Sequence, residues 1–227
     1  MKKIIIIISM LFVIVGCQKE SHIPTQVELN AALADAIKTN DIEKLKNLKL
    51  NKGINEYYNS RTPLFYATEL NNIEAVKYFI EQGADVNKDG VLCGPKVKWL
   101  ECVLKNKPLH IAVRESYADI TKILIENGAD VNMENTLEQT PLFIAAQNGN
   151  KEIVEILKSA GVEYDIFSAI MMQELPTIKT LIKNGADLNK KKLVSLNKVG
   201  KMETPLSLAE QTGNAEIIEL LKSAGAK

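Results

Sequence analysis

One eight-residue phrase occurs three times in the chain, and this repetition constrains the fold more than any other feature. The copies read "IEQGADVN" at 80–87, "IENGADVN" at 125–132 and "IKNGADLN" at 182–189. A unit of this kind cannot bury its apolar face alone, so neighbouring copies must stack on one another. Aligned on the glycine, the chain holds six units of 22 residues, at 32–53, 62–83, 107–128, 140–161, 164–185 and 204–225.

The sequence of each unit predicts two short helices, with residues typical of helix starts and helix ends. Thr62, Thr140 and Thr204 can cap a first helix, and the proline after each of them fits its first turn. A small residue recurs inside the first helix and lets a second helix approach closely, at Ala67, Ala112, Ala145, Ala169 and Ala209. The glycine after the second helix is typical of a left-handed C-cap, and the "ADVN" or "ADLN" that follows is typical of a turn.

The pattern T-P-L-x-x-A…G-A-D-V-N resembles the ankyrin repeat, a helix–turn–helix followed by a β-turn. The resemblance covers about residues 30–227 and implies an all-α ankyrin-repeat solenoid of about six helix–turn–helix units with short β-turn fingers. It also implies that the fingers and first helices line a concave face that binds proteins. The chain departs from the pattern in two ways. His110 alone stands in the usual histidine position, with Lys107 in place of threonine, and the first and fifth units lack the Thr-Pro start.

The N-terminus carries a separate signal. Two lysines precede an apolar run of 12 residues, Ile4–Val15, which is shorter than the roughly 20 residues of a membrane-spanning helix. The end of this segment, "IVGC" at 14–17, resembles the lipobox of bacterial lipoproteins, which implies cleavage after Gly16 and a lipid on Cys17. The alternative is an ordinary secretory signal with an incidental Cys17. We expect a signal peptide at 1–16, a lipidated tether at 17–28 and the repeat domain at 29–227.

Export changes how the remaining cysteines are interpreted. Cys93 and Cys102 flank eight residues, and in an oxidising compartment two thiols at this spacing favour a disulfide. The alternative is a pair of reduced thiols. We expect no metal site, because two cysteines and His110 are too few ligands for structural zinc.

Two insertions interrupt the regular spacing of the units. Residues 88–107 carry five lysines against two acidic residues, a net charge of +3, and residues 190–203 carry five against one, a net charge of +4. Loops on a rigid scaffold are common places for function, and Trp is a frequent interface anchor. We therefore predict partner-binding residues in the insertions, namely Lys96, Lys98, Trp99, Lys191 and Lys192. The alternatives are solvated loops without function and, for residues 191–201, a basic segment that contacts anionic lipid.

Composition and motifs argue against several other functions. Basic and acidic residues both number 28, so the chain as a whole does not look like a nucleic-acid binder. It holds two histidines, far apart in the sequence, and no metalloprotease, nucleophile-elbow, Walker or dinucleotide-binding motif. We predict that the protein is not an enzyme, and we expect no catalytic residues, no cofactor and a monomer.

The sequence therefore predicts a lipid-anchored protein-binding module of the bacterial cell envelope. In a Gram-negative host it would lie on the periplasmic side of the outer membrane. Its partner is expected to be a protein with an acidic surface, and the membrane is reached through lipid on Cys17. Two functions compete: an immunity protein that neutralises a toxin or effector, and a scaffold that holds an envelope enzyme at the membrane without inhibiting it.

Overall fold

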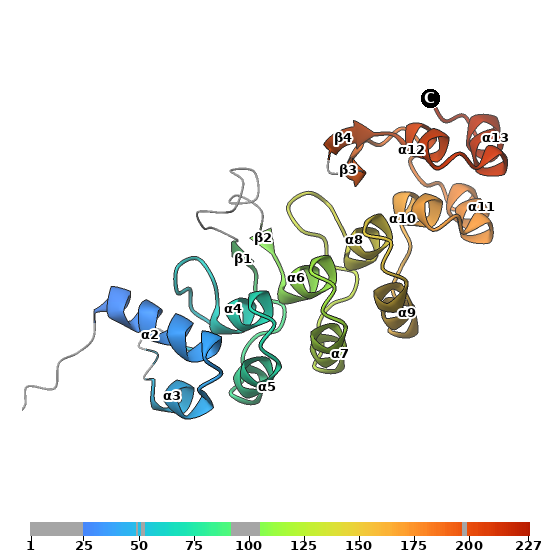
Figure 1. The fold of residues 1–227 in the computed structure, drawn as a ribbon. Coiled ribbons are helices and arrows are strands. Elements are labelled where there is room, and N and C mark those ends of the chain that lie inside the picture. Colours follow the sequence, from blue (N-terminus) through green and yellow to red (C-terminus); the bar gives the residue numbers. More distant parts are fainter. Residues whose placement is uncertain (1–24, 49, 51–52, 92–104, 197–198) are drawn as a thin grey trace, which may run out of the picture.

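The structure is a computed structural model, and it describes residues 25–227 except 49, 51–52, 92–104 and 197–198. Twelve helices lie in two rows along this part of the chain (Figure 1). The inner row, next to the projecting loops, is α2 (Gln26–Lys38), α4 (Pro63–Glu69), α6 (Pro108–Arg114), α8 (Pro141–Gln147), α10 (Ile166–Met171) and α12 (Pro205–Thr212). The outer row is α3 (Ile42–Asn47), α5 (Ile73–Glu81), α7 (Ala118–Glu126), α9 (Lys151–Ser159), α11 (Leu175–Lys183) and α13 (Ala215–Ser223). The six predicted helix–turn–helix units are confirmed.

The inner helices begin where the sequence places their caps. The hydroxyl of Thr62 accepts a hydrogen bond from the Phe65 backbone N–H at 3.2 Å, and Thr140 and Thr204 act in the same way. These bonds satisfy backbone donors that have no partner inside the helix. The fifth unit lacks Thr-Pro and uses Asp165 instead, whose Oδ1 accepts from the Ser168 backbone N–H at 2.6 Å.

The turn phrase "ADVN" has a second use, which is to tie one repeat to the next. The Asn87 side chain donates to the carbonyl oxygen of Gly128 at 3.0 Å and accepts from the backbone N–H of Asp130 at 2.9 Å. Asn55 makes the same pair of bonds to Gly83 and Asp85. Each asparagine thus satisfies backbone groups that the following repeat exposes after its helix ends.

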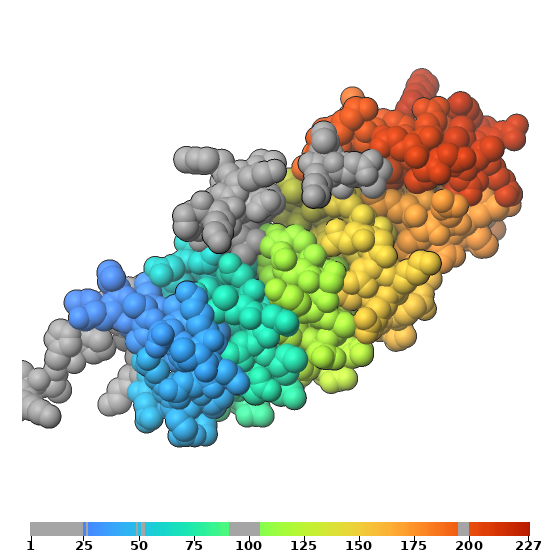
Figure 2. Space-filling view, viewed as in Figure 1, coloured from blue at the N-terminus to red at the C-terminus, as the bar shows by residue number. Residues whose placement is uncertain are grey.

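The core runs between the two helix rows. The five recurring alanines are fully buried, which confirms that a small residue is needed where the helices approach. Most of the buried apolar side chains form two clusters, one from Leu29 to Val162 and one from Phe143 to Leu221. The space-filling view shows successive repeats in contact along the array (Figure 2).

The first unit starts earlier than predicted. Helix α2 begins at Gln26, inside the stretch 17–28 that the sequence analysis assigns to a tether. The reason is a capping box: the Glu28 carboxylate accepts from the Thr25 backbone N–H at 2.8 Å, and the Thr25 hydroxyl accepts from the Glu28 N–H at 3.3 Å. The extra turns lengthen α2 to 13 residues, compared with six to eight in the other inner helices.

Both insertions leave the array through antiparallel strand pairs. Strand β1 (Gly90–Val91) pairs with β2 (Lys105–Asn106) at the base of the first insertion. Strand β3 (Lys192–Leu196) pairs with β4 (Val199–Glu203) over five residue pairs in the second. The second insertion is therefore an ordered hairpin, a longer element than the short β-turn finger that the family pattern predicts.

Candidate functional site

The loops before the inner helices project on one side of the array and form, with those helices, a single surface (Figure 1). We call this surface the finger face. Its described residues are the loops 54–62, 84–91, 105–107, 129–140, 162–165, 186–196 and 199–204 together with the inner helices. It is the surface that the repeat pattern predicts to bind a partner.

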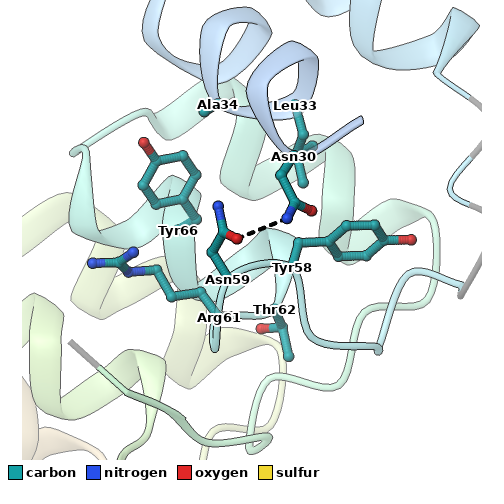
Figure 3. A pocket seen from close by; sticks show the side chains of 8 residues that line it. All are labelled: Asn30, Leu33, Ala34, Tyr58, Asn59, Arg61, Thr62 and Tyr66. Atoms are coloured by element: carbon teal, nitrogen blue, oxygen red, sulfur yellow. Dashed lines mark hydrogen bonds between the residues drawn. The ribbon is translucent and has the colours of Figure 1, made fainter. Parts of the chain in front are cut away.

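A notch lies at the N-terminal end of the finger face, between α2 and the first finger (Figure 3). Its lining residues are Asn30, Leu33, Ala34, Tyr58, Asn59, Arg61, Thr62 and Tyr66. The Asn30 side chain donates to Asn59 Oδ1 at 2.7 Å and ties the helix to the finger. The space open to a water-sized molecule is about 50 Å³. Small-molecule sites usually enclose roughly 300–1,000 Å³, so the notch suits a single side chain or a few water molecules.

Two of the residues that line the notch, Arg61 and Tyr66, contact each other, and Arg61 also forms an ion pair with Glu69. Arg61 Nε lies 2.7 Å from Glu69 Oε2, and Arg61 Nη2 donates a hydrogen bond to Glu69 Oε1 at 3.3 Å. The guanidinium also lies over the Tyr66 ring, 5.4 Å from its centroid. Burial raises the pKa of Glu69, and the charges of Arg61 and Arg114 oppose that shift. This cluster offers an aromatic ring and an arginine, two groups that are common interface anchors.

Tyr57 links the first finger to the base of the first insertion. Its hydroxyl donates to Asp89 Oδ1 at 2.6 Å, and this bond together with burial raises the pKa of Tyr57 to about 12. Lys88 Nζ lies 5.2 Å from the centroid of the ring, while 40% of the residue stays exposed. The base itself is closely packed, because a Cβ on Gly90 would lie 2.6 Å from the Phe65 ring. The first insertion therefore departs from a fixed platform.

Six of the predicted site residues lie outside the described residues: Cys17, Cys93, Lys96, Lys98, Trp99 and Cys102. The lipidation, the disulfide and the role of Trp99 stay predictions from the sequence.

The two remaining predicted site residues lie in different environments. Lys191 is exposed and forms no ion pair within the described part of the chain. The Lys192 side chain is 3% exposed. Its ammonium pairs with Asp165 Oδ2 and lies 4.8 Å from the Phe143 ring centroid and 5.5 Å from that of Phe167. The expectation that Lys192 is a surface charge is wrong, because the hairpin turns this side chain inward.

The second insertion also has fewer unpaired charges than its composition suggests. Lys190 Nζ lies 2.5 Å from Glu138 Oε2, and Lys201 Nζ lies 3.2 Å from Glu203 Oε1. Burial disfavours ionisation of Glu203, but hydrogen bonds from Ser207, Gln211 and Lys201 outweigh it and lower its pKa. Glu138 and Asp165 lie outside residues 190–203, so they balance two of the four formal positive charges of this segment.

The position of the β3–β4 hairpin explains this pairing. The connection between α9 and α10 is only six residues long and forms no long finger of its own. The hairpin leans over that place: Val194 is 1% exposed, and the Leu193 carbonyl oxygen accepts from Gln139 Nε2 at 3.3 Å. The second insertion thus covers the joint between the two core clusters.

His110 is held in a structural role. The Lys107 backbone N–H donates to His110 Nδ1 at 3.1 Å, so Nε2 carries the proton and donates to the Gln139 carbonyl oxygen at 3.1 Å. Burial lowers its pKa to about 4, against the opposing effect of its backbone hydrogen bonds. With both ring nitrogens engaged, this imidazole has no nitrogen left for a substrate or a metal ion.

The described residues hold neither a cluster of metal ligands nor a membrane-spanning helix. Within them, no three histidine, cysteine, aspartate or glutamate side chains come together in an arrangement that could hold a metal ion. None of the described helices combines the length and apolar character needed to cross a bilayer.

Comparison with known proteins gives one consistent result. A family model for ankyrin repeats in three copies matches residues 8–90, 33–135, 90–168 and 109–192. The human transient receptor potential cation channel subfamily A member 1 is 28% identical over 177 residues, which is 73% of this chain and 15% of the channel subunit. A fowlpox virus protein with an ankyrin-repeat name is 31% identical over 172 residues, 70% of this chain and 46% of its own.

A Rickettsia bellii protein, also with an ankyrin-repeat name, is 26% identical over 182 residues, 74% of this chain and 75% of its own. In contrast to this Rickettsia match, the chain spans less than half the length of the human and fowlpox relatives.

Proposed function

Since the chain belongs to the ankyrin-repeat family, whose members bind other proteins, we propose that it binds a protein partner across the finger face. The observation that carries this proposal is the cluster of Tyr57, Arg61, Tyr66 and Glu69. These side chains are anchored to one another or to the base of the first insertion. A solenoid presents such groups on a rigid surface, so little conformational entropy is lost on binding.

We propose further that the protein acts in the bacterial cell envelope, anchored through lipid on Cys17. The support is the sequence "IVGC" after a short apolar run. Acyl chains contribute about 0.8 kcal/mol per buried CH₂, so two or more chains give a stable anchor. Replacing Cys17 by serine should release the protein from the membrane fraction, and retention of the variant after a carbonate wash would place the anchor elsewhere.

The partner is proposed to present acidic groups to Lys96, Lys98 and Lys191, with Trp99 at the centre of the contact. Trp99→Ala should weaken binding by about 2 kcal/mol, mainly through faster dissociation. Lys191→Glu should slow association, and more so at low salt. Lys192 leaves this set, because its charge is already paired with Asp165.

Two biological roles fit such a module. The first is an immunity protein that covers a toxin or effector. The second is a scaffold that holds an envelope enzyme without inhibiting it. Growth protection against the toxic partner would occur only in the first case.

The experiment that tests protein binding is affinity capture from envelope extract followed by mass spectrometry. Tyr57→Ala and Trp99→Ala should both reduce capture of the same partner. The matched control is Lys122→Ala, a change of an exposed residue on the outer helix α7. A partner that is lost equally in all three variants, or in none, would contradict binding at the finger face.

A further inference from the structure

The β3–β4 hairpin has two edges with different surroundings. The β3 edge faces the array, where Gln139, in the finger before α8, donates to the Leu193 carbonyl oxygen. Figure 1 shows β4 on the side of the hairpin away from α8 and α10. Among the described residues, β4 contacts chiefly β3 and α12.

The register identifies which backbone groups of β4 point outward. Two residues separate Leu196 from its partner Val199, and the pair that flanks a two-residue connection exchanges both ladder bonds. Bonded and non-bonded pairs alternate along an antiparallel ladder, so Ser195–Gly200 and Leu193–Met202 are non-bonded pairs. The outward direction of the Leu193 carbonyl oxygen agrees with this assignment. The N–H and C=O groups of Gly200 and Met202 therefore point away from β3.

These outward groups have no hydrogen-bond partner among the residues that the structure describes. Both residues are exposed, and 54% of the surface of Met202 is open to solvent. The strand is nevertheless fixed in place, because Val194 and Glu203, on the opposite face of the hairpin, are buried. An edge of this kind is a template for one more strand.

The charge of Lys201 favours an added strand with an acidic residue over a second copy of β4. Lys201 lies between the two outward residues. Its ammonium lies 3.2 Å from Glu203 Oε1, but its side chain is 74% exposed and stays open to a second carboxylate. In a second copy of the chain, the register that joins Gly200 of each copy to Met202 of the other places two Lys201 side chains opposite each other. Like charges in that position destabilise a sheet, whereas an acidic residue there would be stabilising.

We propose that β4 binds an extended segment of the protein partner as an additional antiparallel strand, with an acidic residue opposite Lys201. The residues that flank this acidic residue would be apolar. One would pack beside Met202, and the other would lie over Gly200, which presents no side chain. This inference rests on the proposed protein-binding role and names the mode of recognition.

The test uses synthetic peptides, so that it does not depend on the natural partner. The probe is the blocked peptide Thr-Val-Thr-Val-Glu-Val-Thr-Val-Thr, and a second peptide carries Lys in place of Glu. Titration into the ¹⁵N-labelled protein should shift the amide signals of Gly200 and Met202 in a saturable way. The Lys peptide should bind about five-fold more weakly or worse, because it reverses the cross-strand charge pair.

Two matched pairs separate strand addition from other contacts. A peptide N-methylated at the two Val residues next to Glu loses the groups that would face β4, whereas one methylated at Glu keeps them. In the protein, Gly200→Pro removes an outward donor, whereas Gly200→Ala keeps it and places its Cβ 3.4 Å from Leu193 Cδ1. The first member of each pair should bind at least about ten-fold more weakly, and the second should bind within about two-fold of the starting peptide or protein.

Four results would overturn the inference. The first is equal binding of the two methylated peptides. This comparison uses the unchanged protein, so it stays valid even if Gly200→Pro disturbs the hairpin. The second is a titration in which other amide signals shift but those of Gly200 and Met202 do not. The third is concentration-dependent pairing of two β4 edges without peptide, detected as dimers by light scattering. A captured natural partner that binds Gly200→Pro as well as it binds the unchanged protein would also refute strand addition, but would leave the protein-binding role in place.

Discussion

Lys192→Met is expected to lower the free energy of unfolding by about 3 kcal/mol, although Lys191→Met, one residue away, should change it by less than about 0.5 kcal/mol. The difference follows from burial. The Lys192 side chain is 3% exposed and its partner Asp165 is 26% exposed. Removing one member of a buried ion pair costs roughly 3–5 kcal/mol, because the other charge is left without a partner. The partial exposure of Asp165 lets water screen its charge, which places the expected loss at the lower end of that range.

The double variant Lys192→Met with Asp165→Asn isolates the charge pair. Asparagine can still cap α10, because its amide oxygen can accept from the Ser168 backbone N–H as the carboxylate does. Without a buried carboxylate there is no unpaired charge, so most of the loss should be recovered.

Urea unfolding followed by circular dichroism gives the free energy of unfolding of all four purified proteins, namely the unchanged chain, Lys191→Met, Lys192→Met and the double variant. A loss of about 3 kcal/mol corresponds to a fall of roughly 6–12 °C in the unfolding temperature for a protein of this size. Equal stability of Lys192→Met and Lys191→Met would show that the hairpin does not bury this ammonium. A double variant no more stable than Lys192→Met would show that packing, rather than charge, holds the hairpin.

Three further outcomes are expected. The folded-state pKa of His110, about 4, lies below its unfolded value of about 6.5. The contribution of the neutral imidazole to the free energy of unfolding is therefore full above pH 6.5 and is lost as the pH falls toward 4, at up to about 1.4 kcal/mol per pH unit. Urea midpoints between pH 5 and 7 should show this slope, and His110→Phe should flatten it. Ser116 has a φ of 64° in the turn after α6, so Ser116→Gly should raise stability by about 0.5 kcal/mol, and a lower unfolding temperature would argue against strain there. Asn87→Ala removes two hydrogen bonds between repeats and should cost about 1–2 kcal/mol, which an unchanged urea midpoint would contradict.

Some of the functional surface could have been predicted from the sequence and some could not. The "TQVE" phrase at Thr25–Glu28 has the spacing of a capping box, so the early start of α2 was readable in advance. The cluster of Arg61, Tyr66 and Glu69 has no signal in the sequence, because an arginine in a turn and a tyrosine in a helix are individually common. Their importance appears only when the finger folds back over the inner helix.

The sequence by itself determined the repeats, the helix starts at threonine and proline, and the glycine stops. These features depend on backbone conformation and on residues three to five positions apart, so they are written locally. Only the tertiary structure decided the environment of Lys192. Phe143, Asp165 and Phe167 lie 25 to 49 residues before it, and they meet it because a hairpin of the sixth repeat covers a joint where the fifth repeat has no long finger. Two adjacent lysines look alike in the sequence, but β3 begins at Lys192 and turns that side chain into the core, whereas Lys191, the residue before the strand, is exposed to water.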